Sequence, residues 1–110
     1  MKQEIKIELL EEAADFLRRL NTKERDKFSY IIRAIMNGYK DSEKFKKLTA
    51  DIWEFRAKSN GNIYRLFAFW DKEQRAFIVY THGFQKKTQK TPQKEIKRAE
   101  AIMKEYYKNR

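Results

Sequence analysis

The chain has 110 residues and a formal net charge of +10, with 26 lysine and arginine residues against 16 acidic ones. This length suits one compact domain, which we expect to span residues 1–110, and it excludes a multidomain enzyme. The chain has no cysteine and one histidine. Disulfides and thiolate metal sites are therefore excluded, and we expect neither a metal nor another cofactor.

The positive charge is concentrated in the second half of the chain. Residues Met1–Phe55 include 12 basic and 11 acidic side chains, whereas Arg56–Arg110 include 14 basic and 5 acidic ones. Lysine and arginine side chains bind phosphate backbones and release condensed counterions. The asymmetry therefore indicates a basic surface that a nucleic acid could occupy.

The sequence lacks the pattern of a membrane span or a secretion signal. Its longest apolar runs, Leu66–Trp70 and Ala76–Tyr80, are far shorter than the roughly 20 residues that a spanning helix needs. Charged residues interrupt the apolar ones at the start of the chain, unlike in a signal peptide. We therefore expect no membrane partner and a cytoplasmic location.

The first half of the chain predicts a strand and two helices. Ile5, Ile7 and Leu9 alternate with charged residues, which is typical of a strand. Two helical stripes follow, and we expect these helices to form an antiparallel pair. Their apolar positions are Ala13, Phe16, Leu17 and Leu20 in the first helix, and Phe28, Ile31, Ile32, Ile35 and Tyr39 in the second.

Local signals mark the two ends of the second helix. Asn21 and Glu24 have the spacing of a capping box, in which each side chain bonds the backbone N–H of the other residue. Gly38 stands where this helix is expected to end. The mainly polar stretch Lys40–Asp51 is interpreted as a connector.

A hairpin is predicted to begin at Ile52. Alternating apolar residues in Ile52–Lys58 and Asn62–Trp70 indicate two strands. The dipeptide Asn60-Gly61 between them is a strong signal for a two-residue turn. Such a turn fixes which residues of the two strands face each other.

In this register Arg56 lies directly opposite Arg65. Like charges at such positions destabilise a strand pair. The pair is tolerated if both groups are solvated, if Glu54 neutralises them, or if a phosphate binds between the two guanidinium groups. In the simplest interpretation, Glu54 and Lys58 share an exposed, salt-bridged face with the arginines. These alternatives stay open, and we expect either arginine to be replaceable by alanine without loss of the fold.

A second hairpin is expected around the loop Asp71–Arg75, with the next strand at Ala76–Thr81. A four-residue loop would place His82 opposite Arg65. Arg56, Arg65 and His82 would then form one row across three strands. A shift of one residue would turn His82 to the other face of the sheet.

Such a row suits cleavage of RNA without a metal. The reaction needs a base for the 2′-hydroxyl, positive charge near the phosphorus and an acid for the departing 5′-oxygen. Arginine and lysine side chains can stabilise the charge, and an imidazole or a lysine of lowered pKa can transfer the protons. A lone histidine at the end of a strand is also commonly structural, so both roles of His82 stay open.

The most basic stretch is His82–Pro92, which is interpreted as a loop leading into the last helix. A bare glycine, an aromatic ring and crowded lysines without an acidic neighbour would let a polyanion lie across the sheet edge. These residues are Gly83, Phe84, Lys86, Lys87 and Lys90.

The last helix is expected to begin after Thr91, which can cap it, with Pro92 at the first helical position. Lys94 lies in its first turn, beside the basic stretch. Lys104 and Lys108 are interpreted as solvated. The apolar stripe consists of Ile96, Ala99, Ile102, Met103 and Tyr106.

Three segments resemble the signature of the phage-derived branch of the RelE/HigB toxin superfamily. They are Leu48–Arg56, Tyr64–Phe67 and His82–Pro92, in matching order and spacing. The resemblance covers nearly the whole chain. It implies a RelE-like α+β fold, in which a small, mainly antiparallel sheet packs with an N-terminal helix pair and a C-terminal helix.

The resemblance also implies a function. Relatives are toxins of type II toxin–antitoxin systems that enter the ribosomal A site and cut mRNA, and an antitoxin, often with a helix-turn-helix, blocks them. We therefore expect a ribosome-dependent, metal-independent endoribonuclease that is a monomer or part of a toxin–antitoxin complex.

The resemblance and the residue pattern together give the predicted site. Arg56, Arg65, Lys86 and Lys87 occupy basic positions of the family pattern. With His82 they form the predicted catalytic set, whereas the predicted RNA-binding residues are Phe84, Lys90 and Lys94. Other branches place a tyrosine or an acidic group near the chain end, and the identity of the general base stays open.

Two other function classes also remain. The chain could be a non-catalytic binding module, such as a co-repressor subunit or an RNA-docking protein, for which the basic half alone would suffice. It could also be a degenerate relative that retains only the antitoxin interface.

Overall fold

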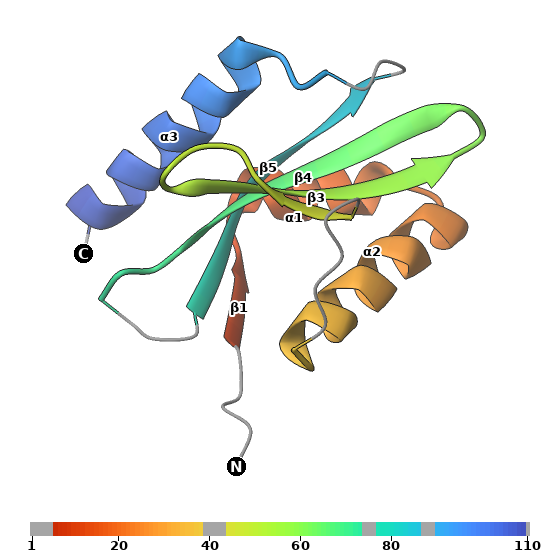
Figure 1. Ribbon diagram of the computed structural model, residues 1–110, viewed down its shortest axis with the longest axis horizontal. Coiled ribbons are helices and arrows are strands. Elements are labelled where there is room, and N and C mark those ends of the chain that lie inside the picture. Colours follow the sequence, from red (N-terminus) through yellow and green to blue (C-terminus); the bar gives the residue numbers. More distant parts are fainter. Residues whose placement is uncertain (1–5, 39–43, 74–76, 87–89, 110) are drawn as a thin grey trace.

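The structure, a computed structural model, describes residues 6–38, 44–73, 77–86 and 90–109. Within these residues, five strands form one sheet in the order β1-β5-β4-β3-β2, antiparallel except for the parallel pair β1 and β5. Figure 1 shows the elements, which are β1 (Lys6–Leu9), α1 (Glu11–Arg19), α2 (Thr22–Met36), β2 (Phe45–Lys47), β3 (Ile52–Ser59), β4 (Asn62–Trp70), β5 (Phe77–Lys86) and α3 (Gln93–Lys108). The predicted α+β fold is confirmed.

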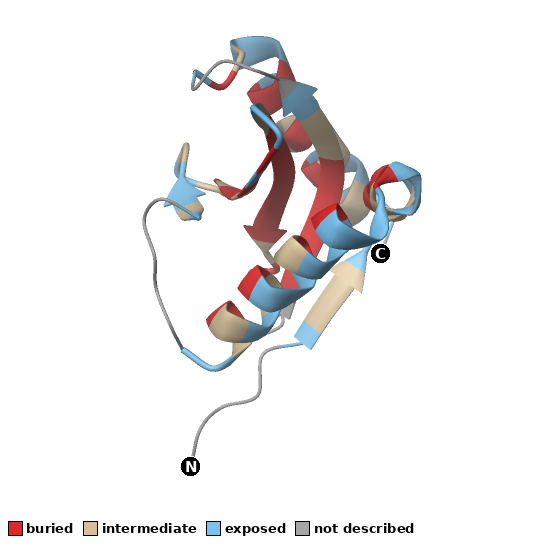
Figure 2. Cartoon of the chain, turned by 90° about the vertical axis from the view of Figure 1, so that its right-hand side faces the viewer, coloured by how far each residue is buried: buried red, intermediate tan, exposed pale blue. Residues whose placement is uncertain are grey.

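Helices cover both faces of this sheet. One buried cluster joins α1 and α2 to the sheet and includes Phe16, Phe28 and Leu66. A second cluster joins α3 to the opposite face and includes Phe67 and Met103. Each fully buried apolar side chain of this size contributes roughly 1.5–3 kcal/mol. The middle strand, β4, is buried from Ile63 to Phe69, and Figure 2 shows buried strand between the helices.

The β3–β4 hairpin has the predicted turn and register. Asn60 and Gly61 both have positive φ, at 50° and 79°, as a type I′ turn requires. Arg56 pairs directly with Arg65, as expected. The turn signal was sufficient because it allows only one pairing of the flanking strands.

The capping box of α2 is also confirmed. The Asn21 side chain accepts a hydrogen bond of 2.9 Å from the Glu24 backbone N–H, and the Glu24 side chain accepts one of 3.1 Å from the Asn21 backbone N–H. The helix ends at Met36, shortly before Gly38, whose φ of +89° suits glycine.

Two assignments made from the sequence were wrong. The presumed connector Lys40–Asp51 contains the short strand β2, in which Phe45 pairs with Phe55 and stacks on Trp53 with ring centroids 4.5 Å apart. The first part of the presumed basic loop is also a strand, because β5 continues to Lys86.

A β-bulge corrects the predicted position of His82. The β4–β5 pairing shifts between Leu66 and Ala68, so that two residues of β5, Thr81 and His82, lie opposite one residue of β4. Arg65 therefore pairs with Phe84 and not with His82. The row across the three strands consists of Arg56, Arg65 and Phe84.

Gly83 has a packing role. A Cβ atom built on it would lie 2.0 Å from the Phe16 ring, much closer than any normal contact. The absence of a side chain therefore allows α1 to pack tightly against β5. This contact lies on the face of the sheet opposite α3.

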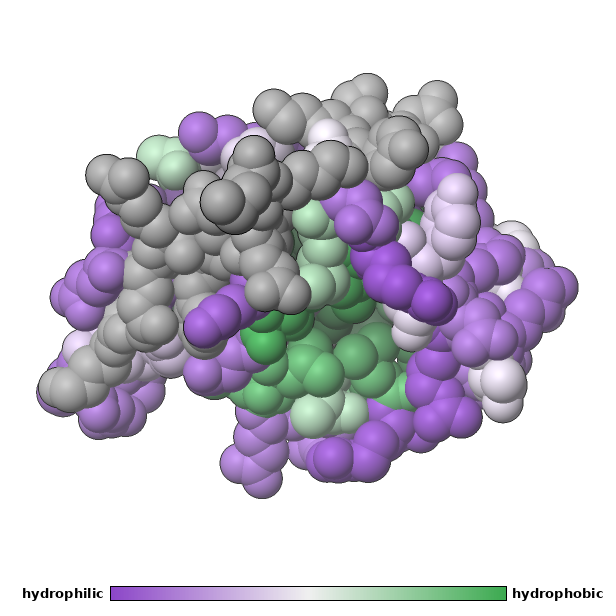
Figure 3. All heavy atoms as spheres, turned by 90° about the horizontal axis from the view of Figure 1, so that it is seen from below, coloured by the Kyte–Doolittle hydropathy of each residue, from purple (hydrophilic) through white to green (hydrophobic). Residues whose placement is uncertain are grey.

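Seen from below in Figure 3, the described part of the molecule presents an apolar hollow with hydrophilic side chains around it. Among the described residues, we find no helix whose length and apolar character would let it cross a membrane.

Candidate active site

The two opposed arginines share one buried carboxylate. The Glu54 carboxylate accepts a hydrogen bond from Arg56 Nε, and its Oε2 lies 3.1 Å from Arg65 Nη1. Glu54 and Arg65 are fully buried, whereas the Arg56 side chain is 15% exposed. Glu54 therefore neutralises the like-charge pair, as one of the three sequence-based explanations proposed. The interpretation of Glu54 and Arg65 as part of an exposed face was wrong.

Thr91 joins this network. Its Oγ1 donates to Glu54 Oε2 and accepts from Arg65 Nη1, both at 2.5 Å. Thr91 was expected to cap α3, but the N-cap is Pro92 and no side chain caps this helix end. The start of α3 is therefore tied to β3 and β4 through the side chain of Thr91.

The network gives the two arginines different roles. Arg65 is enclosed by Glu54 and Thr91 and does not reach solvent. Arg56 reaches the surface while Glu54 holds its Nε. An anion that approaches this surface meets a guanidinium group whose orientation is already fixed, which is how preorganised charge stabilises a developing anion.

His82 lies on the α3 face but is buried. Its exposed fraction is 1%, and its ring stacks on Phe67 with centroids 4.8 Å apart. Nε2 lies 3.1 Å from Glu95 Oε1, and Nδ1 lies 3.1 Å from Thr81 Oγ1. Because an ionised carboxylate only accepts, Nε2 carries the hydrogen toward Glu95. Both ring nitrogens are thus engaged by protein groups.

The charge state of His82 follows from this environment. Burial lowers the pKa of His82, the Arg98 guanidinium lowers it further, and the hydrogen bond to Glu95 acts in the opposite direction. The imidazole is therefore neutral at neutral pH. This geometry favours the structural interpretation, and the catalytic role of His82 stays a prediction.

The other predicted site residues differ in how far they are buried and in where they lie. Phe84 is half-buried opposite Arg65, and Lys90 and Lys94 are exposed near the start of α3. Lys86 ends β5 opposite Ile63. The side chain of Lys86 and the whole of Lys87 lie outside the described residues.

The tyrosines near the chain end hold α3 in place. Tyr106 donates a 2.7 Å hydrogen bond to Asp71, and Tyr107 accepts one of 2.9 Å from the Lys72 backbone N–H. Tyr106 lies fourteen positions after Pro92, which corresponds to about 21 Å along a helix axis. These tyrosines therefore lie at the end of α3 that is remote from Thr91.

Sequence reasoning missed Thr91 and Glu95 as partners of site residues. Because side chains alternate between the two faces of a strand, Glu54 was expected on the same face as Arg56. The contact between these two residues was therefore anticipated. Thr91 and Glu95 approach the sheet from a different element, and no local pattern signals such a contact.

The sequence matches the family described as "Phage derived protein Gp49-like" over residues 15–104. No curated protein matches it. A solved structure of the isolated Escherichia coli toxin RelE, in its P21 form, is 15% identical with a TM-score of 0.60, over 86% of this chain and 97% of that one.

Two further E. coli structures also match. A free RelE mutant with two arginines changed to alanine gives a TM-score of 0.58 at 14% identity, over 74% of this chain and 82% of that one. A chain of the intact RelBE toxin–antitoxin complex gives 0.57 at 14% identity, over 72% and 93%. These likenesses show a common fold.

Proposed function

The chain belongs to the family of phage-derived Gp49-like proteins, and from this we propose that it is the toxin of a type II toxin–antitoxin pair, an endoribonuclease that cuts mRNA on the ribosome. The match to the family and the RelE-like fold support the toxin assignment. The proposed partners are mRNA on the ribosome and a cognate helix-turn-helix antitoxin, and the proposed location is the cytoplasm.

One observation carries the enzymatic part of this proposal. Arg56 reaches the surface, and its guanidinium is oriented by Glu54, which also contacts the buried Arg65. This carboxylate and two guanidinium groups leave one net positive charge, which favours the binding of a phosphate. In this proposal Phe84 contacts a base, and Lys90 and Lys94 contact phosphates of the RNA.

The proposed reaction needs no co-reactant. The 2′-oxygen attacks the adjacent phosphorus, the bond between phosphorus and the 5′-oxygen breaks, and the products are a cyclic phosphate and a 5′-hydroxyl. One proton leaves the 2′-hydroxyl and one reaches the 5′-oxygen. Arg56 would stabilise the charge on the phosphate oxygens. His82, Lys86 and Lys87 remain the candidates for proton transfer.

Replacement of Arg56 by alanine tests this function. We expect mRNA cleavage to fall about 10²–10³-fold, as when one preorganised donor to a developing anion is removed. The fold should persist because Glu54 keeps its contacts with Arg65 and Thr91. Growth after induction and mapped mRNA ends are the measurements, with thermal melting as a check of folding.

Lys104→Ala provides the control, because this exposed lysine lies on α3 toward the chain end. Cleavage by folded Arg56→Ala at the rate of the parent chain would contradict the site. Ribosome binding by the parent chain without new mRNA ends would instead favour a non-catalytic binding module.

A further inference from the structure

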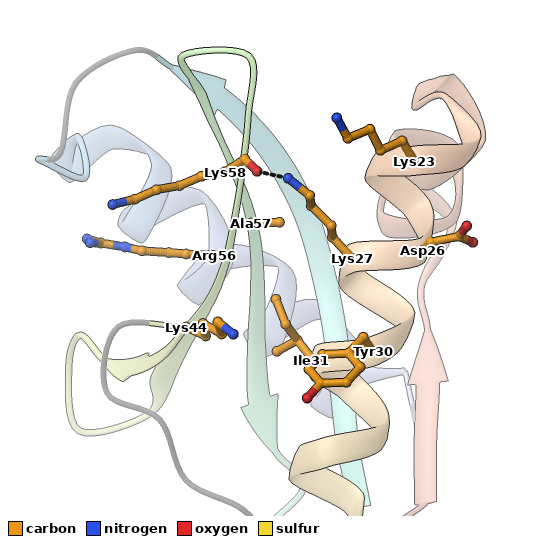
Figure 4. A pocket seen from close by; sticks show the side chains of 9 residues that line it. All are labelled: Lys23, Asp26, Lys27, Tyr30, Ile31, Lys44, Arg56, Ala57 and Lys58. Carbon is orange, nitrogen blue, oxygen red and sulfur yellow. Dashed lines mark hydrogen bonds between the residues drawn. The ribbon is translucent and has the colours of Figure 1, made fainter.

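A groove lies between α2 and the outer edge of β3, on the side of the sheet away from α3. We call it the α2–β3 groove; its volume is about 570 Å³, and Figure 4 labels the residues that line it. Helix α2 contributes Lys23, Lys27, Tyr30 and Ile31, and Ala57 of β3 points toward them in Figure 4.

The outer edge of β3 forms one side of this groove. β2 pairs with β3 only over Trp53–Phe55, and the Lys44 carbonyl accepts one further bond of 2.8 Å from the Arg56 N–H. Beyond Arg56, none of the described strands pairs with this edge of β3. The Lys58 carbonyl accepts a hydrogen bond from the Lys27 ammonium instead. A short, lysine-capped edge resists nonspecific strand pairing and leaves room for a specific partner.

The lining combines positive charge with apolar surface. Five of the lining side chains are basic and one, Asp26, is acidic. The basic side chains are Lys23, Lys27, Lys44, Arg56 and Lys58. The hollow itself is bounded by Ile31 and Ala57, and Tyr30 is 65% exposed at its margin. An exposed apolar surface rimmed by polar groups marks an interaction site.

We propose that the α2–β3 groove binds an acidic segment of the antitoxin, with aliphatic or aromatic side chains anchored in the hollow and carboxylates paired with its basic rim. The proposal rests on the proposed function, because that function supplies the inhibitor. Charge complementarity identifies an acidic partner. The apolar hollow favours a protein, because aliphatic side chains of an acidic segment would pack on Ile31 and Ala57 while its carboxylates pair with the basic rim.

Arg56 explains how this occupant would inhibit. It lines the α2–β3 groove and is also the arginine of the candidate active site that reaches the surface. A carboxylate bound at the groove would pair with the guanidinium that the proposed reaction needs for the phosphate. Binding and inhibition would then share one residue, although the rest of the groove lies away from α3.

The test measures binding of the protein encoded by the reading frame beside this chain's gene. We compare Lys23→Glu plus Lys27→Glu with a matched control, Lys104→Glu plus Lys108→Glu, which changes the net charge equally on the exposed surface of α3. We expect Kd to rise at least about tenfold for the groove variant only, since attraction becomes repulsion. Tyr30→Ala, which changes no charge, should also weaken binding about tenfold.

Each readout decides a separate point. Equal Kd values for the groove variant and its control, unchanged binding by Tyr30→Ala, or no binding by the parent chain would overturn the docking site. Loss of mRNA cleavage in a folded groove variant would assign the groove to RNA and also overturn it. Binding through the groove by a parent chain that neither arrests growth nor cuts mRNA would contradict the proposed function and leave the docking site standing.

Discussion

At the scale of single residues, Glu54 determines how two arginines can face each other. Its carboxylate contacts both guanidinium groups from a fully buried position. Removing one partner of a buried ion pair typically costs about 3–5 kcal/mol, because the other charge stays buried without compensation. We therefore expect Arg65→Ala to lose stability, which differs from the expectation drawn from the sequence. Arg56, which reaches solvent, gives the cleaner test of the site.

His82 gives a prediction about pH. Burial lowers its pKa in the folded chain, so the unfolded chain binds the proton more readily. Its contribution to stability is complete above the ordinary pKa of 6.5 and is lost as pH falls below that value. We expect urea unfolding to show this loss between neutral and mildly acidic pH, and His82→Gln to abolish this part of the pH dependence.

The same variant tests catalysis by His82. No other histidine is present in the chain, so the comparison isolates this side chain. A structural histidine predicts cleavage per folded molecule close to that of the parent chain. A loss of about 10²–10⁴-fold in a stably folded His82→Gln protein would instead establish proton transfer by the imidazole.

The two arginines and His82 show what a sequence can specify at this scale. The Asn60-Gly61 turn lies beside Arg56 and Arg65 and sets their pairing by local geometry. The position of His82 depends on a bulge within β5, and no turn residue signals that bulge. Burial of His82 depends further on α3, which lies far along the chain.

At the scale of elements, a bare glycine sets the distance between α1 and β5. Gly83→Ala would place a methyl group 2.0 Å from the Phe16 ring, so the helix or the strand must move. Overpacking of this kind costs typically 1–3 kcal/mol. We expect a loss of about 2 kcal/mol in the free energy of unfolding, measured with urea.

A double-mutant cycle checks the cause of that loss. In a Phe16→Ala background the clash is absent, so adding Gly83→Ala should cost much less than it does alone. An equal cost in both backgrounds would show that the strain arises in the backbone of Gly83 and not at the ring of Phe16.

Elements also differ in how clearly the sequence marks them. The helices and the β3–β4 hairpin repeat their apolar pattern over many residues, so periodicity was sufficient to predict them. β2 has three residues and no measurable period. Its existence depends on Phe45 packing against Trp53 and Phe55, which is a tertiary contact.

At the scale of the whole molecule, α3 joins the candidate active site to the far end of the sheet. Its N-terminal end is tied to the arginine network by Thr91 and to β5 by the contact between Glu95 and His82. Its C-terminal end is tied to Asp71 and Lys72, which follow β4. The position of the start of α3, where Lys94 lies, therefore depends on contacts at both ends of this helix.

Replacement of both terminal tyrosines by phenylalanine separates anchoring from catalysis. Tyr106→Phe plus Tyr107→Phe removes the hydroxyl groups that bond Asp71, the Lys72 N–H and the Trp70 carbonyl. Because a hydrogen bond contributes roughly 0.5–1.5 kcal/mol, we expect the loss of these three to lower stability by about 1.5–4.5 kcal/mol. Cleavage per folded molecule should not change, since these hydroxyls lie at the end of α3 remote from Thr91. Urea unfolding and mapping of mRNA ends measure the two effects, and a large loss of cleavage in a stably folded variant would make one of these tyrosines the proton-transfer group.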